Sequence, residues 1–125
     1  MSEITTTTAL DPIDGYSSIS VYYLPAQISI LGDETDVIMS FGRAYLPVVI
    51  DMLSTELARY DAAIAANANA VFTGTQRRVI STDNSYAFGV ELSVSSSTVR
   101  YIVGTTSESI SISHSKDALA LLRQV

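Results

Sequence analysis

Apolar and polar residues alternate along one stretch in the C-terminal half of the chain. Large apolar side chains occupy every second position from Tyr86 to Val94, and small or polar residues stand between them. A period of two over this length is typical of a strand with one face in a core and the other at a surface. We therefore expect 86–94 to be the central strand of a sheet.

The same period recurs on both sides of this strand, with short polar turns in between. Asp83 and Asn84 suit a hairpin turn because both residues tolerate left-handed backbone conformations. The pattern predicts an antiparallel four-strand meander. Its strands are 77–82, 86–94, 98–103 and 108–114. A short helix over 116–124 is expected to follow, with Ser115 as its N-cap.

The N-terminal third predicts two or three further strands. Segments 19–23 and 27–31 are rich in β-favouring residues and are interrupted by Pro25. Proline has no N–H for a ladder, so it marks an edge strand, a bulge or a break between strands. Segment 37–41 fits either a strand or a short helix, and we favour a strand.

From Pro47 to Ala70 the apolar period changes to three and four. Val49, Leu53 and Leu57 begin a stripe that fits one face of a helix, and proline suits the first helical turn. The opposite side carries small or polar residues. These are Asp51, Thr55, Arg59, Ala62 and Ala66, of which the last four are candidate interface residues. This side is either a solvent face or a contact with a helix of a neighbouring subunit.

Together these elements predict an α+β fold. The antiparallel sheet, a four-strand C-terminal meander plus two or three N-terminal strands, packs against the long helix and the short C-terminal helix. We expect a single domain over 19–125, preceded by a polar, threonine-rich N-terminal arm over 1–18. That segment is either a frayed terminus or an arm that lies on a neighbouring subunit.

Charge and composition narrow the classes of partner. The 125 residues carry seven Lys and Arg against thirteen Asp and Glu, a net charge of −6. This balance disfavours nucleic-acid phosphates and anionic membrane surfaces. No apolar run reaches the ~20 residues of a membrane span, and no secretory signal is recognisable, so we expect no membrane partner and cytoplasmic synthesis.

The surface composition favours contacts with other subunits. Charged residues make up only 16% of the chain, below the usual ~25%, and Ser and Thr supply much of the polar surface. Small hydroxyl side chains lose less conformational entropy than long charged ones when a partner covers them. Tyrosine also favours interfaces, because it combines contact area with a polar tip. Tyr16, Tyr22 and Tyr23 are therefore candidate interface residues.

Candidate chemistry is sparse. His114, the single histidine, has no partner in any recognisable motif, and we interpret it as an ordinary surface or cap residue. The acidic segments 11–15 and 33–36 lack the spacing of an EF-hand loop and are interpreted as solvated turns. There is no cysteine. The sequence predicts no catalytic, cofactor-binding or metal-binding residue.

Three classes of function follow. The leading hypothesis is a non-enzymatic structural subunit that self-assembles: a small phage or virus virion protein (coat, cement, neck or tail component) that forms homo-oligomers and contacts other structural proteins. An alternative is a small-ligand-binding protein or enzyme with a pocket between the sheet and the long helix. A second alternative is a single-stranded nucleic-acid-binding module that uses Arg77, Arg78 and Arg100.

Overall fold

The computed structural model describes residues 2–69, 73–79, 87–93 and 96–125. The first half of the chain forms β1 (Ser2–Thr7), β2 (Ser18–Tyr23), β3 (Gln27–Gly32), β4 (Asp36–Gly42), a 3-10 turn at Arg43–Tyr45 and α1 (Leu46–Ala66). The second half forms β5 (Thr73–Val79), β6 (Ala87–Ser93), β7 (Thr98–Val103), β8 (Thr106–Ser111) and α2 (Ile112–Leu122).

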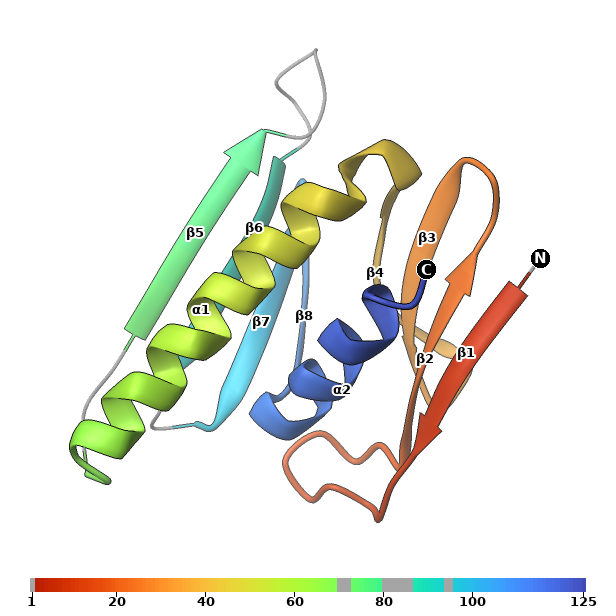
Figure 1. The fold of residues 1–125 in the computed structure, drawn as a ribbon. Coiled ribbons are helices and arrows are strands. Elements are labelled where there is room, and N and C mark those ends of the chain that lie inside the picture. Colours follow the sequence, from red (N-terminus) through yellow and green to blue (C-terminus); the bar gives the residue numbers. More distant parts are fainter. Residues whose placement is uncertain (1, 70–72, 80–86, 94–95) are drawn as a thin grey trace.

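The strands of the described residues form two four-stranded antiparallel sheets (Figure 1). Sheet A has the order β1-β2-β3-β4 and sheet B the order β5-β6-β7-β8, so both are simple meanders. The α+β class, the C-terminal meander and the two helices are confirmed. Neither helix in the described ranges is long and apolar enough to cross a bilayer.

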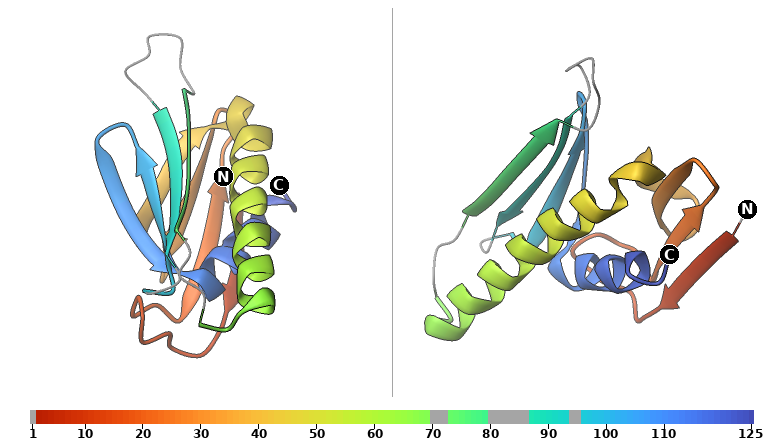
Figure 2. Two further views of the ribbon diagram at one scale, coloured as in Figure 1. Left: turned by 90° about the vertical axis from the view of Figure 1, so that its left-hand side faces the viewer. Right: turned by 45° about the horizontal axis from the view of Figure 1, so that its top comes forward.

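Each helix covers the sheet formed by the other half of the chain. The long helix α1 follows sheet A but packs on β5 and β6, whereas α2 follows sheet B and packs mainly on β2 and β1 (Figures 1 and 2). The sheets meet where β4 lies against β7 and β8. The two halves therefore share one core.

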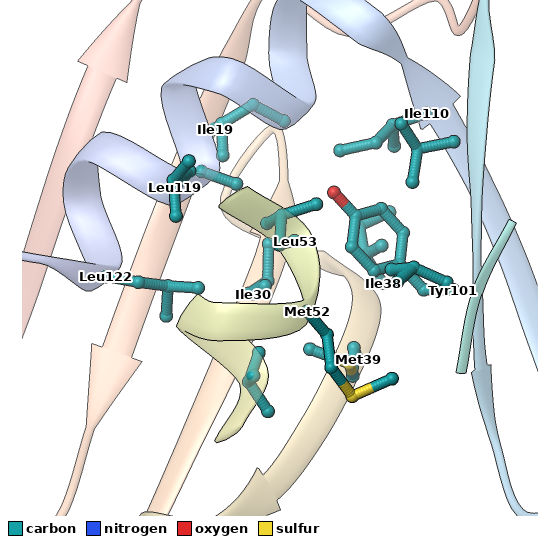
Figure 3. Close-up of a cluster of buried hydrophobic side chains, with 14 of the residues drawn as sticks. Ile19, Ile30, Ile38, Met39, Met52, Leu53, Tyr101, Ile110, Leu119 and Leu122 are labelled. Carbon is teal, nitrogen blue, oxygen red and sulfur yellow. The ribbon is translucent and has the colours of Figure 1, made fainter. Parts of the chain in front are cut away.

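That core lies between the inner faces of the sheets and the two helices. Figure 3 shows Met52 and Leu53 of α1 in one cluster with Leu119 and Leu122 of α2. Strand register places Val21, Ile30 and Met39 side by side on the inner face of sheet A, and all three are buried. Burying each such side chain contributes about 1.5–3 kcal/mol. The predicted contact between the long helix and the 86–94 strand is present in β6 and α1.

The N-terminal segment belongs to sheet A. Residues 2–7, within the segment 1–18 expected as an arm, form β1 and pair antiparallel with β2. Segment 37–41 lies in β4, so our preference for a strand over a helix is confirmed. A register shift at Ile30/Leu31 accommodates an extra residue in β4.

Helix α1 ends earlier than predicted. It stops at Ala66, four residues before Ala70, because Asn67 adopts an extended conformation and its side-chain oxygen accepts the N–H of Asn69. Such local side-chain hydrogen bonds compete with a helical backbone.

The C-terminal helix begins earlier than predicted. The expected strand over 108–114 ends at Ser111, and α2 starts at Ile112 instead of 116. The N-cap is Ser111, not Ser115, because the Ser111 Oγ accepts the N–H of His114. The predicted turn at Asp83–Asn84 and the strand positions Tyr86 and Val94 lie outside the described residues.

Candidate functional site

A polar cluster lies where the loop after β1 meets the first turn of α2. The loop folds into a tight turn in which Asp11 Oδ1 accepts the N–H of Ile13, and Gly15 supplies a positive φ of 78°. Asp14 Oδ1 accepts the N–H of Tyr16 at 2.9 Å. The turn thereby directs the second carboxylate oxygen of Asp14 toward α2.

Asp14 forms a buried pair with His114. Its Oδ2 lies 2.6 Å from His114 Nδ1 and 2.9 Å from the backbone N of Ser111. The side chains of Asp14 and His114 are each only 2% exposed. The interpretation of His114 as an ordinary surface or cap residue is therefore wrong, since the N-terminal loop covers it and supplies its partner.

The second ring nitrogen of His114 faces the end of β1. Nε2 lies 3.2 Å from Thr8 Oγ1. A carboxylate can only accept, so Nδ1 carries the proton toward Asp14. Nε2 then accepts from Thr8 when the ring is neutral and donates to it when the ring is charged. Thr8, His114 and Asp14 thus form a continuous hydrogen-bonded chain between the N-terminal loop and α2.

This chain has the connectivity of a nucleophile, a base and an orienting acid. Acyl transfer also needs hydrogen-bond donors for the developing oxyanion near the nucleophile. The oxygens beside Thr8 Oγ1 are instead acceptors: the carbonyls of Ala9 at 3.2 Å and Ser17 at 3.5 Å. Carbonyl oxygens repel a developing negative charge, and the arrangement is better suited to holding the loop than to catalysis.

The cluster also contains a metal-like set of atoms. Asp11, Asp14 and His114 each bring one potential ligand atom within 4.8 Å of the others. Asp14 already accepts hydrogen bonds on both oxygens. The pKa of the Asp11 carboxyl is lowered by hydrogen bonds from the Ser111 side chain and the Ile13 backbone, with a smaller contribution from the charge of His114. Hydrogen bonding therefore accounts for the cluster.

The predicted interface tyrosines occupy three different environments. Tyr16 is half-buried against Gly32, where a Cβ would come within 2.6 Å of its ring. Burial, followed by a hydrogen bond to Asp36, raises the pKa of Tyr16 to about 12. The guanidinium of Arg43 lies 5.8 Å from the ring centre of Tyr23, within cation–π range. Tyr22 lies on the outer face of sheet A.

The helix residues predicted at an interface share one surface of α1. Thr55, Arg59, Ala62 and Ala66 are all exposed. Arg59 is anchored by Glu56, whose Oε1 lies 3.0 Å from Arg59 Nη1. The expected separation of a buried and an exposed side of the helix is present, and the contact with another subunit stays a prediction.

A shallow, mainly apolar hollow lies on the outer face of sheet A. It is lined by Tyr22, Leu24, Gln27, Ser29, Leu31, Glu34 and Val37. Leu24 and Val37 are 41% and 54% exposed, respectively. Below, these seven residues are called the sheet A hollow.

The predicted nucleic-acid residues do not form a basic patch in the described part of the structure. Arg100 donates from Nε and Nη2 to Glu91 Oε2, at 3.0 and 2.6 Å, so its charge is balanced on the surface of sheet B. The backbone of β5 includes Arg77 and Arg78, but their side chains lie outside the described residues. A cation already paired with a carboxylate is a poor phosphate ligand.

Sequence reasoning missed the Asp14–His114 pair and the sheet A hollow. One local signal for the pair existed. Ser111 precedes His114 by three residues, which is the spacing between an N-cap residue and the N3 residue whose N–H it accepts. Comparisons with protein-family models, with curated proteins and with solved structures find no match to this chain.

Proposed function

We propose that the protein is a non-enzymatic structural subunit that self-assembles. The sheet A hollow carries this proposal. When one face of an antiparallel sheet packs on a core, the other face is normally polar and exposed to water. Here the second face exposes Leu24 and Val37 around Tyr22 and Leu31. Contiguous apolar surface of this kind is typical of interaction sites.

The polar groups beside the hollow are suited to being covered. Thr5 Oγ1 and Ser20 Oγ lie 2.9 Å apart, and Ser29 Oγ and Ser40 Oγ lie 2.7 Å apart, across neighbouring strands. These hydroxyls hydrogen-bond one another, so a partner that displaces water leaves few polar atoms unsatisfied. Covering this face therefore gains apolar burial at a small polar cost.

The finer proposal is a virion component of a phage or virus, as a coat, cement, neck or tail subunit. Support comes from the low content of charged residues and from the hydroxyl-rich surface of the chain. Under this proposal the subunit is made in the cytoplasm and joins copies of itself, and other structural proteins, in a particle.

Sedimentation velocity over a range of protein concentrations tests the proposal. We expect wild type to form oligomers as concentration rises. Val37→Asp places a carboxylate in the hollow and should shift the protein to monomer without lowering its melting temperature, because position 37 is exposed. Leu10→Asp is the matched control, since Leu10 is an exposed leucine of the N-terminal loop outside the hollow. Wild type that remains monomeric at every concentration contradicts the proposal.

A further inference from the structure

Strand β1 forms an open edge of sheet A. It stands at one end of the order β1-β2-β3-β4, and the described part of the chain places no element beside its outer edge (Figures 1 and 2). The other sheet edges differ. β4 and β8 lie against each other where the two sheets meet, and β5 includes Arg77 and Arg78, whose charges disfavour pairing with another strand. Among the described strands, β1 therefore has the edge that is most open to another strand.

This edge lacks the features that normally prevent strand pairing, which are proline, lysine and a β-bulge. The six residues of β1 include no Pro, Lys or Arg, and they pair with β2 without a register shift. Their one charge is the carboxylate of Glu3. Hydrogen bonds from Thr5 and Tyr22 lower the pKa of Glu3, and Tyr22 is its neighbour on β2. The carboxylate is therefore held over the face of sheet A and does not guard the edge.

The direction of the backbone groups along β1 follows from the hydrogen bond at its end. The N–H of Thr8 donates to the carbonyl of Ser17 at 2.9 Å, one position beyond the last pair of the β1–β2 register. In an antiparallel pair, residues that bond the neighbouring strand alternate with residues whose N–H and C=O point away from it. Glu3, Thr5 and Thr7 therefore direct their N–H and C=O groups toward the open edge.

Such an edge is complementary to a second copy of itself. Two β1 strands related by a twofold axis run antiparallel, so outward N–H groups meet outward carbonyls. With the axis at Thr5, Thr5 pairs with its own counterpart and Glu3 pairs with Thr7 of the second copy. This register uses all three outward residues, and cross-strand Thr–Thr pairs are favourable. It also places the two Glu3 residues about 14 Å apart, beyond the screening length of ~8 Å at physiological salt.

We propose that two copies join through their β1 strands, antiparallel about a twofold axis at Thr5, so that two copies of sheet A become one continuous sheet. The axis is perpendicular to the sheet, so the sheet A hollows of both copies face the same side. A partner that contacts both hollows then gains from their linkage.

This inference rests on the proposed function, because the β1 contact is too small to hold a dimer alone. One pair of six-residue strands is about 20 Å long and buries less than the ~1,200 Å² of a stable interface. The edge contact therefore forms in copies that also associate through the hollow, and a variant with a blocked hollow stays monomeric.

Cysteine cross-linking tests the pairing, because the chain has no cysteine of its own. Under mild oxidation Thr5→Cys should form a disulfide-linked dimer, which a non-reducing gel detects. Residues in a hydrogen-bonded antiparallel pair have Cα atoms about 5.5 Å apart, within disulfide range. Leu10→Cys is the control, since it places an exposed thiol in the loop after β1, outside the paired residues, and should stay unlinked.

Two further cysteines test the register. Glu3→Cys and Thr7→Cys should each cross-link no more than Leu10→Cys, because two copies of either residue lie about 14 Å apart. An equal mixture of the two should give a linked dimer, since residue 3 of one copy then faces residue 7 of the other. Cross-linking of Glu3→Cys alone to the same extent as the mixture contradicts the twofold axis at Thr5.

A backbone variant gives a second measurement. Thr5→Pro removes an outward N–H and should weaken self-association at least about tenfold in sedimentation velocity. Thr5→Val is its matched control, because it keeps that N–H and loses the same hydroxyl, and it should assemble as wild type does.

The outcomes separate this contact from the proposed function. If wild type assembles but Thr5→Cys cross-links no more than Leu10→Cys, or Thr5→Pro assembles as Thr5→Val does, the β1 contact is wrong while the proposed function stands. If wild type is monomeric at every concentration, both fail. Circular dichroism and melting temperature confirm that each variant is folded.

Discussion

At the scale of single residues, Asp14 is the main tie between the two ends of the chain. Its carboxylate accepts N–H groups from Tyr16 and Ser111 and the ring N–H of His114. The side chain is 2% exposed, so water cannot replace these bonds when the carboxylate is removed. Removing one partner of a buried pair leaves the other without compensation, which is more costly than losing the interaction alone.

We therefore expect Asp14→Ala to lower the free energy of unfolding by about 2–3 kcal/mol, because it leaves buried N–H donors without an acceptor. The same change at the more exposed Asp11 should cost only about 1 kcal/mol. Urea denaturation followed by circular dichroism measures both values. Similar losses for the two variants would show that Asp14 and His114 do not act as a buried pair.

This pair also marks a limit of sequence analysis. Periodicity reports which residues of one element share a face, and it predicted β2, β3, β4 and the four-strand meander of sheet B. It missed β1, whose residues were expected in an arm, and it placed the first and last strands of the meander too late: β5 is Thr73–Val79 instead of 77–82, and β8 is Thr106–Ser111 instead of 108–114. Asp14 and His114 are separated by 100 residues, and no local pattern connects a turn aspartate to a histidine in a serine-rich segment. Only the packing of α2 beside β1 and β2 brings them together.

At the scale of elements, α1 shows how closely a pattern can predict burial. The apolar stripe over Val49, Leu53 and Leu57 is buried, whereas Thr55 on the opposite side is exposed. The ends of both helices were harder to place, because they depend on single hydrogen bonds. Asn67 ends α1 and Ser111 begins α2. In each case another residue a few positions away is an equally plausible end of the helix.

Opposite substitutions on α1 test its orientation. Leu57→Asp should unfold or aggregate the protein, because Leu57 is 3% exposed and a carboxylate there has no partner. Thr55→Asp should leave the melting temperature nearly unchanged, since surface changes usually alter stability by less than about 0.5 kcal/mol. Differential scanning calorimetry gives both values. Equal damage from the two substitutions would mean that the buried side of the helix is wrongly assigned.

At the scale of the whole molecule, the exchange of helices joins the two halves into one cooperative unit. Sheet A relies on α2 and sheet B relies on α1 to cover an apolar face. Sequence patterns predicted the order of the elements from β2 to α2, but they predicted neither β1 nor the division of the strands into two sheets. They also did not predict the exchange, because each helix is equally amphipathic whichever sheet it covers.

Separate fragments should reveal this dependence. We expect 1–69 and 70–125, produced alone, to lack cooperative thermal unfolding, because each sheet has lost the helix that covers it. Mixed in equal amounts, they should regain the circular dichroism of the intact chain. Cooperative unfolding of either fragment alone would contradict the shared core.

The same exchange bears on synthesis at the ribosome. The N-terminal half emerges first, whereas α2, the helix that covers sheet A, follows all the strands that the structure describes. The apolar inner face of sheet A therefore stays uncovered until α2 has been translated. A product that ends at a premature stop codon before Ile112 would lack α2, and its exposed apolar face would be bound by chaperones or cleaved by proteases. The fold thereby distinguishes a polypeptide that reaches α2 from one that does not.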